Sequence, residues 1–350
     1  MTPAPYPRTS STPERPRMTV SLNRRQFLAA STLTLAAVGL AACTPRQGSA
    51  FLSPTADAVD AAEAGRLTTG ATIERALTAE PVTLDLAGQT VKTWGYRGAS
   101  AAEPIRGNVG DLLRVTLTND LPDATTVHWH GLALRNDMDG VPGLTQSAID
   151  AGDTFTYEFA LPHAGTYWFH PHVGTQLDRG LYAPLIIDDP RERADYDREW
   201  VIVLDDWLDG VTATPDDVFA ELSRGMGGMG GMDHGGMPMR MGNTLMGATS
   251  DLLGGDAGDV YYPLYLINGR PRLDPETFTA KPGERIRLRI INAGGDTAFR
   301  FGVTGHLITI THTDGYPVAP HEAESVVIGM GERYDAILTA ADGVFAVIAE

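Results

Sequence analysis

The sequence has very little cysteine, since Cys43 is the single cysteine among its 350 residues. One thiol cannot form an intramolecular disulfide, a Cys-x-x-Cys zinc site or an iron–sulfur cluster, because each of these needs more than one cysteine in the chain. The sequence therefore excludes a disulfide-stapled fold. Any thiolate ligand of this chain would have to come from Cys43.

Basic residues are also scarce: 27 Lys and Arg stand against 44 Asp and Glu, which gives a formal net charge of −17. Nucleic-acid binding needs a basic face that neutralises phosphates, so we expect no nucleic-acid partner. Hydrophobic residues make up 43% of the chain and charged residues 20%, a composition that allows a buried core. A chain of 350 residues has room for about two domains.

The apolar stretch near the N-terminus, residues 27–42, is shorter than the about 20 residues that a membrane-spanning helix needs. It follows the paired Arg24 and Arg25, and this order of basic, apolar and small residues is typical of an export signal of the twin-arginine type. The segment LAAC at 40–43 resembles a bacterial lipobox. This predicts an extracytoplasmic protein, at the cell surface or in the periplasm, with a lipid on Cys43. The alternative is a secreted protein in which Cys43 has no role.

Alternation of apolar and polar residues dominates the chain beyond residue 80. The segments 113–118, 154–159 and 285–290 repeat with a period of two, which predicts strands with one buried face. Turn sequences separate them, as in antiparallel sandwiches or barrels. The blocks 106–119 and 280–292 share a Gly-containing turn followed by an alternating strand that ends in Asn. We therefore predict an all-β chain with two related β-sandwich domains.

The predicted domains occupy residues 80–190 and 191–350. A signal at 1–43 and a small, polar linker at 44–79 precede them. Residues 210–258 interrupt the second domain, and their Gly and Met content predicts an insertion with little regular structure.

Four of the nine histidines form two His-x-His units, His128-Trp129-His130 and His170-Pro171-His172. Residues i and i+2 of a strand project from the same face, so each unit presents two imidazoles side by side. Two adjacent strands would bring four imidazoles together, and imidazole binds copper, zinc, iron and nickel. The spacing also allows the two rings of a unit to bind different metal ions. The alternative is four histidines that are hydrogen-bonded in a polar core.

With their flanking residues, the two units resemble the first two copper motifs of the multicopper oxidases. The resemblance lies in TVHWHGLAL at 126–134 and GTYWFHPHVGTQLDRGLYAPLII at 165–187, and it continues in LINGRPRLD at 266–274 and GERYDAIL at 331–338. It implies that the two sandwiches are consecutive cupredoxin-like Greek-key domains. It also implies an enzyme that oxidises Cu(I) or phenolic reductants and reduces O₂ to water.

The resemblance implies a role for each of the four histidines. His128 matches a ligand of the type 2 copper, and the other three match ligands of the type 3 copper pair: His130, His170 and His172. Asp139 resembles the carboxylate that assists proton delivery in bacterial cuprous oxidases, although an Asp-Gly pair is also an ordinary turn sequence.

Half of the ligand set of the family is missing from this sequence. The family binds its trinuclear copper centre with eight histidines, and the cysteine of a His-Cys-His motif binds type 1 copper. Neither that motif nor His-x-x-His-x-His occurs here, and Cys43 has no neighbouring histidine. We therefore expect the chain to be the first two domains of an oxidase whose third domain, with type 1 copper, is absent from it. Two alternatives remain: an extracytoplasmic copper-binding or copper-resistance protein without turnover, and a copper-free cupredoxin scaffold.

A methionine-rich stretch lies inside the predicted insertion. Its many glycines disfavour a helix, and thioethers are soft ligands that prefer Cu(I). A loop that collects Cu(I) is one interpretation, and a low-complexity loop without a ligand is the other. The candidate ligands are Met226, Met229, Met232, His234, Met237, Met239 and Met241.

Overall fold

The structure, a computed structural model, describes Ser53 and residues 56–192, 195–223, 239–242, 244–246, 249–250, 255–256 and 260–350. The predicted export signal with Cys43 lies outside these residues, and so do Met226, Met229, Met232, His234 and Met237. Only the backbone of Met239 and Met241 is described. Among the helices that the structure describes, none is both long enough and apolar enough to cross a membrane.

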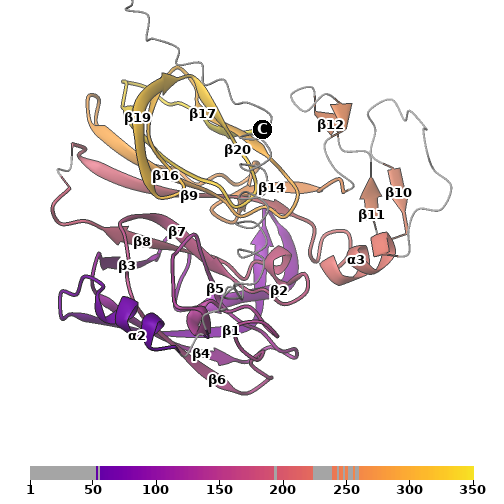
Figure 1. Cartoon of the computed structure of the whole chain (residues 1–350). Coiled ribbons are helices and arrows are strands. Elements are labelled where there is room, and N and C mark those ends of the chain that lie inside the picture. Colours follow the sequence, from indigo (N-terminus) through magenta and orange to yellow (C-terminus); the bar gives the residue numbers. More distant parts are fainter. Residues whose placement is uncertain are drawn as a thin grey trace, which may run out of the picture. The chain divides into compact units, whose positions relative to one another are not determined.

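The first half of the described chain folds into a β-sandwich (Figure 1). One sheet has the strand order β2-β1-β4-β6 and the other the order β3-β8-β7-β5. The two sheets enclose a core that includes Leu113, Trp129, Tyr157 and Phe169. The elements are α2 (Asp57–Ala64), β1 (Thr72–Leu86), β2 (Gln89–Arg97), β3 (Ile105–Asn108), β4 (Leu112–Asn119), β5 (His128–His130), η1 (Asn136–Met138), β6 (Thr154–Ala160), β7 (Gly165–His170), η2 (Gln176–Arg179) and β8 (Ala183–Asp188).

The second half builds a second sandwich from a seven-stranded sheet, β15-β14-β9-β16-β21-β18-β19, and a three-stranded sheet, β20-β17-β22. Its core includes Ile202, Leu288, Phe301 and Leu338. The elements are β9 (Arg198–Trp207), α3 (Pro215–Ser223), β10 (Met239–Met241), β11 (Thr244–Met246), β12 (Thr249–Ser250), β13 (Gly255–Asp256), β14 (Leu264–Ile267), β15 (Arg270–Pro271), β16 (Arg285–Asn292), β17 (Phe299–Val303), β18 (Ile308–Thr313), β19 (Tyr316–Ala323), β20 (Ser325–Ile328), β21 (Arg333–Thr339) and β22 (Val347–Ala349). The predicted all-β class with two sandwiches is confirmed.

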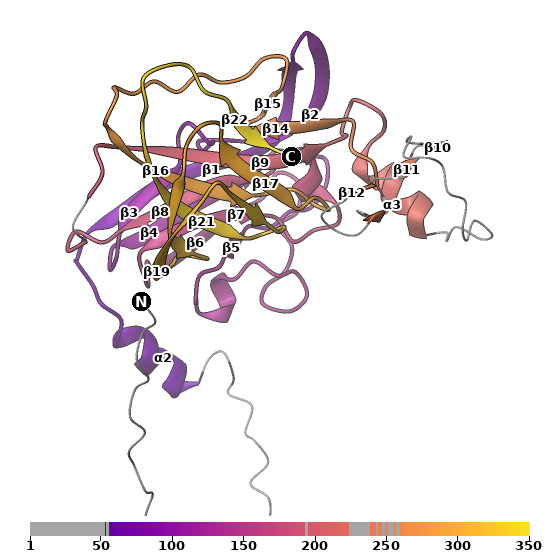
Figure 2. The same cartoon turned by 90° about the horizontal axis from the view of Figure 1, so that it is seen from above.

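Helices and strands also occur in two segments for which the sequence predicted little regular structure: the linker and the insertion. The predicted linker at 44–79 contains α2 and the first eight residues of β1. The first half of β1 pairs in parallel with β4 and its second half pairs with β2. In residues 72–79, three exposed residues in a row precede three buried ones, so this half lacks the alternation of buried and exposed residues that marks a strand. Inside the predicted insertion, α3 buries Val218 beside Leu208 and Tyr262. In both views, α3 and the short strands β10–β12 lie beside the sandwiches (Figures 1 and 2).

Strand β16 departs from the predicted alternation, because seven of its eight residues are buried. Its apolar face packs into the second core, as expected. Its other face carries Arg287 and Arg289, which are 3% and 1% exposed. The sequence pattern predicted that this arginine face lies in water. That prediction is wrong, because acidic side chains of neighbouring strands cover the face.

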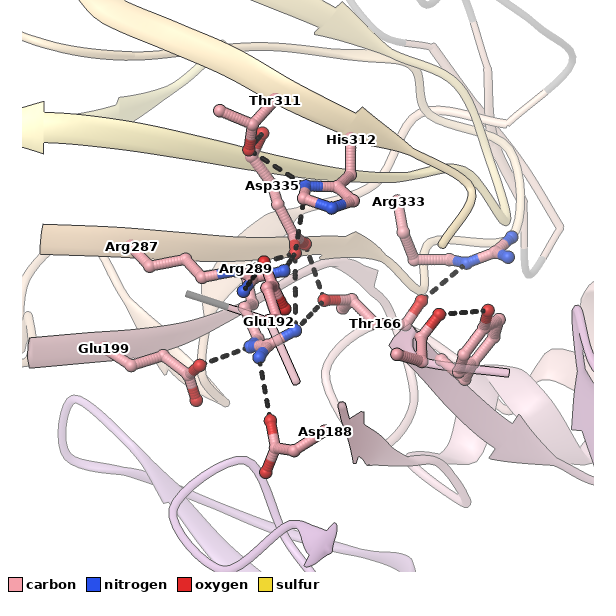
Figure 3. Close-up of polar contacts among 12 residues, drawn as sticks. Thr166, Asp188, Glu192, Glu199, Arg287, Arg289, Thr311, His312, Arg333 and Asp335 are labelled. Carbon is pink, nitrogen blue, oxygen red and sulfur yellow. Dashed lines mark hydrogen bonds and ion pairs between the residues drawn. The ribbon is translucent and has the colours of Figure 1, made fainter. Parts of the chain in front are cut away.

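The buried arginines form an ion-pair network that joins the two sandwiches (Figure 3). Arg289 donates to Glu199 of β9, to Asp188 at the end of β8 and to the Thr166 hydroxyl on β7. Asp335 of β21 accepts from Arg287 at 2.6 Å and from the Thr166 hydroxyl at 2.5 Å. Burial alone would raise the pKa of Asp335, but the two guanidinium groups lower it below its ordinary value. Thr166 and Asp188 belong to the first sandwich, so the network fixes β7 against the second.

We expect Asp335→Asn to lower the free energy of unfolding by about 3–5 kcal/mol, because it leaves two buried guanidinium groups without their shared carboxylate. Asp274→Asn is the matched control, since the Arg270–Asp274 pair is about half exposed on both sides. That change should cost no more than about 1 kcal/mol. Urea unfolding of both variants measures the difference, and equal losses would contradict the account.

Candidate metal centre

The two His-x-His units lie on and directly after neighbouring strands of the sheet β3-β8-β7-β5. The register of the antiparallel pair β5 and β7 places His128 opposite His170, Trp129 opposite Phe169 and His130 opposite Trp168. Side chains alternate between the faces of a strand, so this register puts both histidines of β5 on the face that carries His170. Trp129 and Phe169 point the other way and are fully buried. His172 follows two residues after the end of β7.

The ring nitrogens of the four histidines come close together. His130 Nδ1 lies 3.2 Å from His170 Nε2. One nitrogen each from His128, His170 and His172 lie within 4.8 Å of one another. Two imidazole nitrogens bound to one metal ion at about 2.0 Å with tetrahedral angles are about 3.3 Å apart. The separation between the His130 and His170 nitrogens therefore fits one shared metal ion. The nitrogens of His128 and His172 lie near enough to that of His170 to bind metal ions in the same cluster.

Backbone carbonyls fix the tautomers of two rings. His128 Nδ1 lies 2.8 Å from the carbonyl oxygen of Asp139, and His170 Nδ1 lies 3.0 Å from that of Pro171. A carbonyl oxygen can only accept a hydrogen bond, so each Nδ1 carries the proton. The Nε2 lone pair of both rings is then available to a metal ion.

The Asp139–Gly140 turn holds the His128 ring. η1 ends directly before Asp139, whose carboxylate Oδ1 also lies 3.3 Å from His128 Nδ1. Gly140 has a φ of +76°, and a side chain there would overlap the carbonyl of Val127. Only glycine fits a left-handed position packed so closely against the strand. The backbone bends at Asp139, and this bend brings Asp139 to the histidine.

Burial favours the uncharged form of three of the imidazoles. The pKa of His130 falls to about 3, chiefly because the ring is buried and further because the Arg333 guanidinium and the neighbouring histidines oppose protonation. Burial also lowers the pKa of His170 to about 3, although the Pro171 carbonyl opposes this shift. Partial burial lowers the pKa of His172. Metal ions bind the neutral ring, so these rings need lose no proton at neutral pH before they bind.

An indole orients two of the rings. Trp168 stacks on His130 with ring centroids 4.8 Å apart and on His170 with centroids 4.4 Å apart. Its side chain is 2% exposed and is packed beside Val203 and Ile291 of the second sandwich. A packed neighbour that fixes ligand rings reduces the reorganisation that metal binding requires. The donor set is therefore four oriented imidazoles, which suits copper, zinc, iron or nickel.

Comparison with known proteins decides among these metals. Two family models, both described as multicopper oxidase, match residues 78–192 and 244–350. The chain belongs to the multicopper oxidase family. The resemblance inferred from the sequence motifs is confirmed, and membership of this family implies copper as the metal.

Relatives from bacteria align with most of the chain. It is 47% identical over 331 residues to the multicopper oxidase MmcO of Mycobacterium tuberculosis, an alignment that covers 93% of this chain and 63% of that protein. It is 31% identical over 336 residues to copper resistance protein A of Escherichia coli, which covers 92% of this chain and 53% of that protein. The chain therefore spans between about half and two thirds of the length of these two relatives.

Solved structures support the fold. The crystal structure of the blue copper oxidase from Nitrosomonas europaea superposes with a TM-score of 0.62 at 30% identity, over 80% of this chain and 79% of that chain. The prediction of consecutive cupredoxin-like sandwiches is confirmed by this multicopper oxidase fold.

Sequence reasoning missed the contribution of the second sandwich to the site. Gly331 lies beside the His130 ring, and Arg333 lies against the backbone of Gly131, the residue after His130. Both belong to the GERYDAIL segment, which carried the family resemblance but no predicted role at the metal centre. A glycine in a turn gives no sign of which distant ring it will meet, so no local pattern could have found this contact.

Proposed function

We propose that this chain supplies half of the trinuclear copper site of a multicopper oxidase. The complete enzyme oxidises Cu(I) or a phenolic reductant and reduces O₂ to water. The observation that carries this proposal is the convergence of four imidazoles from β5, β7 and the residues directly after β7, with His130 Nδ1 3.2 Å from His170 Nε2. The bound copper supplies one-electron transfer and O₂ reduction. The type 1 copper that accepts electrons is expected in a further domain.

Each histidine has a proposed role. His128 holds the type 2 copper, and the imidazoles of His130, His170 and His172 hold the type 3 pair. The carbonyls of Asp139 and Pro171 keep the Nε2 atoms of His128 and His170 free of protons, which supports this assignment. Trp168 covers two of the rings and excludes water from that side.

Asp139 is proposed to deliver protons during O₂ reduction. Its carboxylate oxygen lies 3.3 Å from His128 Nδ1, and its side chain is 30% exposed, so it can exchange protons with water. A carboxyl group that contacts both solvent and a ligand ring is suited to this role.

A copper-binding protein without turnover is the second candidate. It is favoured by the likeness to copper resistance protein A, which is 31% identical to this chain. Such a protein would use the same four histidines to hold copper, and it would not consume O₂ when given Cu(I). The intact histidine cluster disfavours a copper-free scaffold.

Export and copper collection belong to the same proposal. Arg24, Arg25 and Cys43 support export by the twin-arginine route and attachment to a membrane through a lipid. The methionine-rich stretch that begins at Met226 is proposed to collect Cu(I) outside the cytoplasm. The net charge of −17 favours copper cations over anionic reductants.

Copper titration tests the proposed site. We expect the 350-residue chain to take Cu(I) from a chromophoric chelator, and His170→Ala to weaken this binding at least about tenfold. His321→Ala is the matched control, because His321 is an exposed histidine on β19. Equal binding by the two variants, or no binding by the unchanged chain, would exclude this copper site.

Asp139→Asn separates proton delivery from copper binding. The variant keeps the backbone carbonyl that caps His128, so copper content should stay unchanged. We expect the rate of O₂ consumption by the complete, copper-loaded oxidase to fall about 10- to 100-fold, because the proton donor is gone. A rate within about twofold of the unchanged enzyme would remove Asp139 from the mechanism.

Membrane fractionation tests the anchor. The unchanged protein should sediment with membranes, and Cys43→Ser should move it to the soluble extracytoplasmic fraction, because the acylated thiol is lost. Equal distribution of the two proteins would contradict lipid attachment at Cys43.

A further inference from the structure

The turn between β20 and β21, residues 329–332, belongs to the second sandwich but lies against a ring of the metal centre. A Cβ built on Gly331 would lie 2.9 Å from Cε1 and 3.2 Å from Nε2 of His130. Real Cβ contacts are essentially never shorter than 3.0 Å, so a side chain at this position would force the His130 ring or the turn to shift. The Gly331 backbone therefore packs against the Cε1–Nε2 edge of His130 and leaves Nδ1 facing His170.

Hydrogen bonds on both sides keep this turn in place. The Gly331 N–H donates to the carbonyl of Asn292 at 3.0 Å, and the Asn292 N–H donates to the carbonyl of Glu332 at 3.1 Å. The Glu332 carboxylate accepts from the Gly329 N–H at 2.7 Å. Asn292 is fully buried at the end of β16, and its side chain also donates to the carbonyl of Ile328. The turn is thus bonded to the end of β16 and cannot move away from the ring without breaking these bonds.

Arg333, the first residue of β21, ties the same turn to the first sandwich. Its Nη1 donates to the Gly331 carbonyl at 3.0 Å. Its Nε donates to the Thr166 carbonyl of β7 at 3.2 Å (Figure 3). Asp314 pairs with the guanidinium at 3.1 Å. A side chain on Gly131 would overlap the guanidinium, so this group also lies against the residue that follows His130.

We propose that the β20–β21 turn and Arg333 are positioning elements for copper: they fix the His130 ring and, through it, the ion that His130 shares with His170. This inference rests on the proposed copper centre. Three contacts define the ring position, since Trp168 covers one face, His170 faces Nδ1 and Gly331 packs against the remaining edge. The second sandwich thereby controls copper binding with no ligand of its own in this cluster.

The turn offers a test with a matched control. Gly331 has a φ of +78° and Gly283, in a turn before β16, has a φ of +85°, but a Cβ on Gly283 would meet nothing within 4 Å. Both Gly→Ala changes carry the same backbone strain, and only Gly331→Ala meets His130. In a Cu(I) titration of the 350-residue chain, Gly331→Ala should bind copper about 10- to 100-fold more weakly than Gly283→Ala. Equal binding by the two variants would overturn the proposal.

A double-mutant cycle shows whether the ring carries the effect. In a His130→Ala background the added methyl group has no imidazole to meet, so Gly331→Ala should no longer weaken the residual copper binding. A loss that persists in this background would mean that the turn acts through general disruption, and it would overturn the proposal.

A second variant covers the case in which Gly331→Ala does not fold. Arg333→Lys keeps the charge but cannot bridge the carbonyls of Gly331 and Thr166, so copper binding should weaken several-fold. Arg198→Lys, at the solvated pair with Glu284, is the control, and equal binding by the two lysine variants would count against the proposal. If the unchanged chain binds no more Cu(I) than His170→Ala, the proposed copper centre is wrong. If the unchanged chain binds Cu(I) more tightly, but Gly331→Ala and Arg333→Lys bind it as tightly as their control variants, only the positioning role of the turn and Arg333 is wrong.

Discussion

The register between β5 and β7 is the constraint on which the metal centre depends. It sets His128 opposite His170 and sends Trp129 and Phe169 into the first core. Because the side-chain period of a strand is two, a slip of one residue would turn the aromatic side chains into the site and the histidines into the core. The burial of two large aromatic residues therefore holds the imidazoles in place. The same strand register thus determines both the hydrophobic core and the metal centre.

The second sandwich supports this strand pair from outside. Thr166 of β7 is held by Arg289 and Asp335 through its hydroxyl and by Arg333 through its carbonyl (Figure 3). These buried charges are stable only as a complete set, because each lost partner leaves an uncompensated charge in the interior. These contacts hold Thr166, which lies near the start of β7 and four residues before His170 on the same strand. A domain with no ligand in the described cluster thus determines the geometry of the cluster.

The sequence allowed the fold class and the four histidines to be predicted, because both depend on local patterns. Alternation marked β4 and β16, and the His-x-His spacing predicted imidazoles on one face. A local sequence pattern does not show which segments pack against a strand face. The pattern of β16 therefore predicted Arg287 and Arg289 to face solvent, whereas acidic residues of β21 and β9 pair with them in the interior. The contact between Gly331 and His130 joins residues 201 positions apart, so it follows only from the tertiary structure. The roles predicted for Cys43 and the methionine-rich stretch concern residues whose side chains the structure does not describe.

The central claim is that four histidines, on β5, on β7 and directly after β7, hold copper. Anomalous diffraction at the copper absorption edge, from crystals of the copper-loaded protein, tests it most directly. The account predicts copper peaks within bonding distance of His128, His130, His170 and His172, with the His130 ring still packed against Gly331. Copper bound elsewhere, with no peak among these four rings, would contradict it.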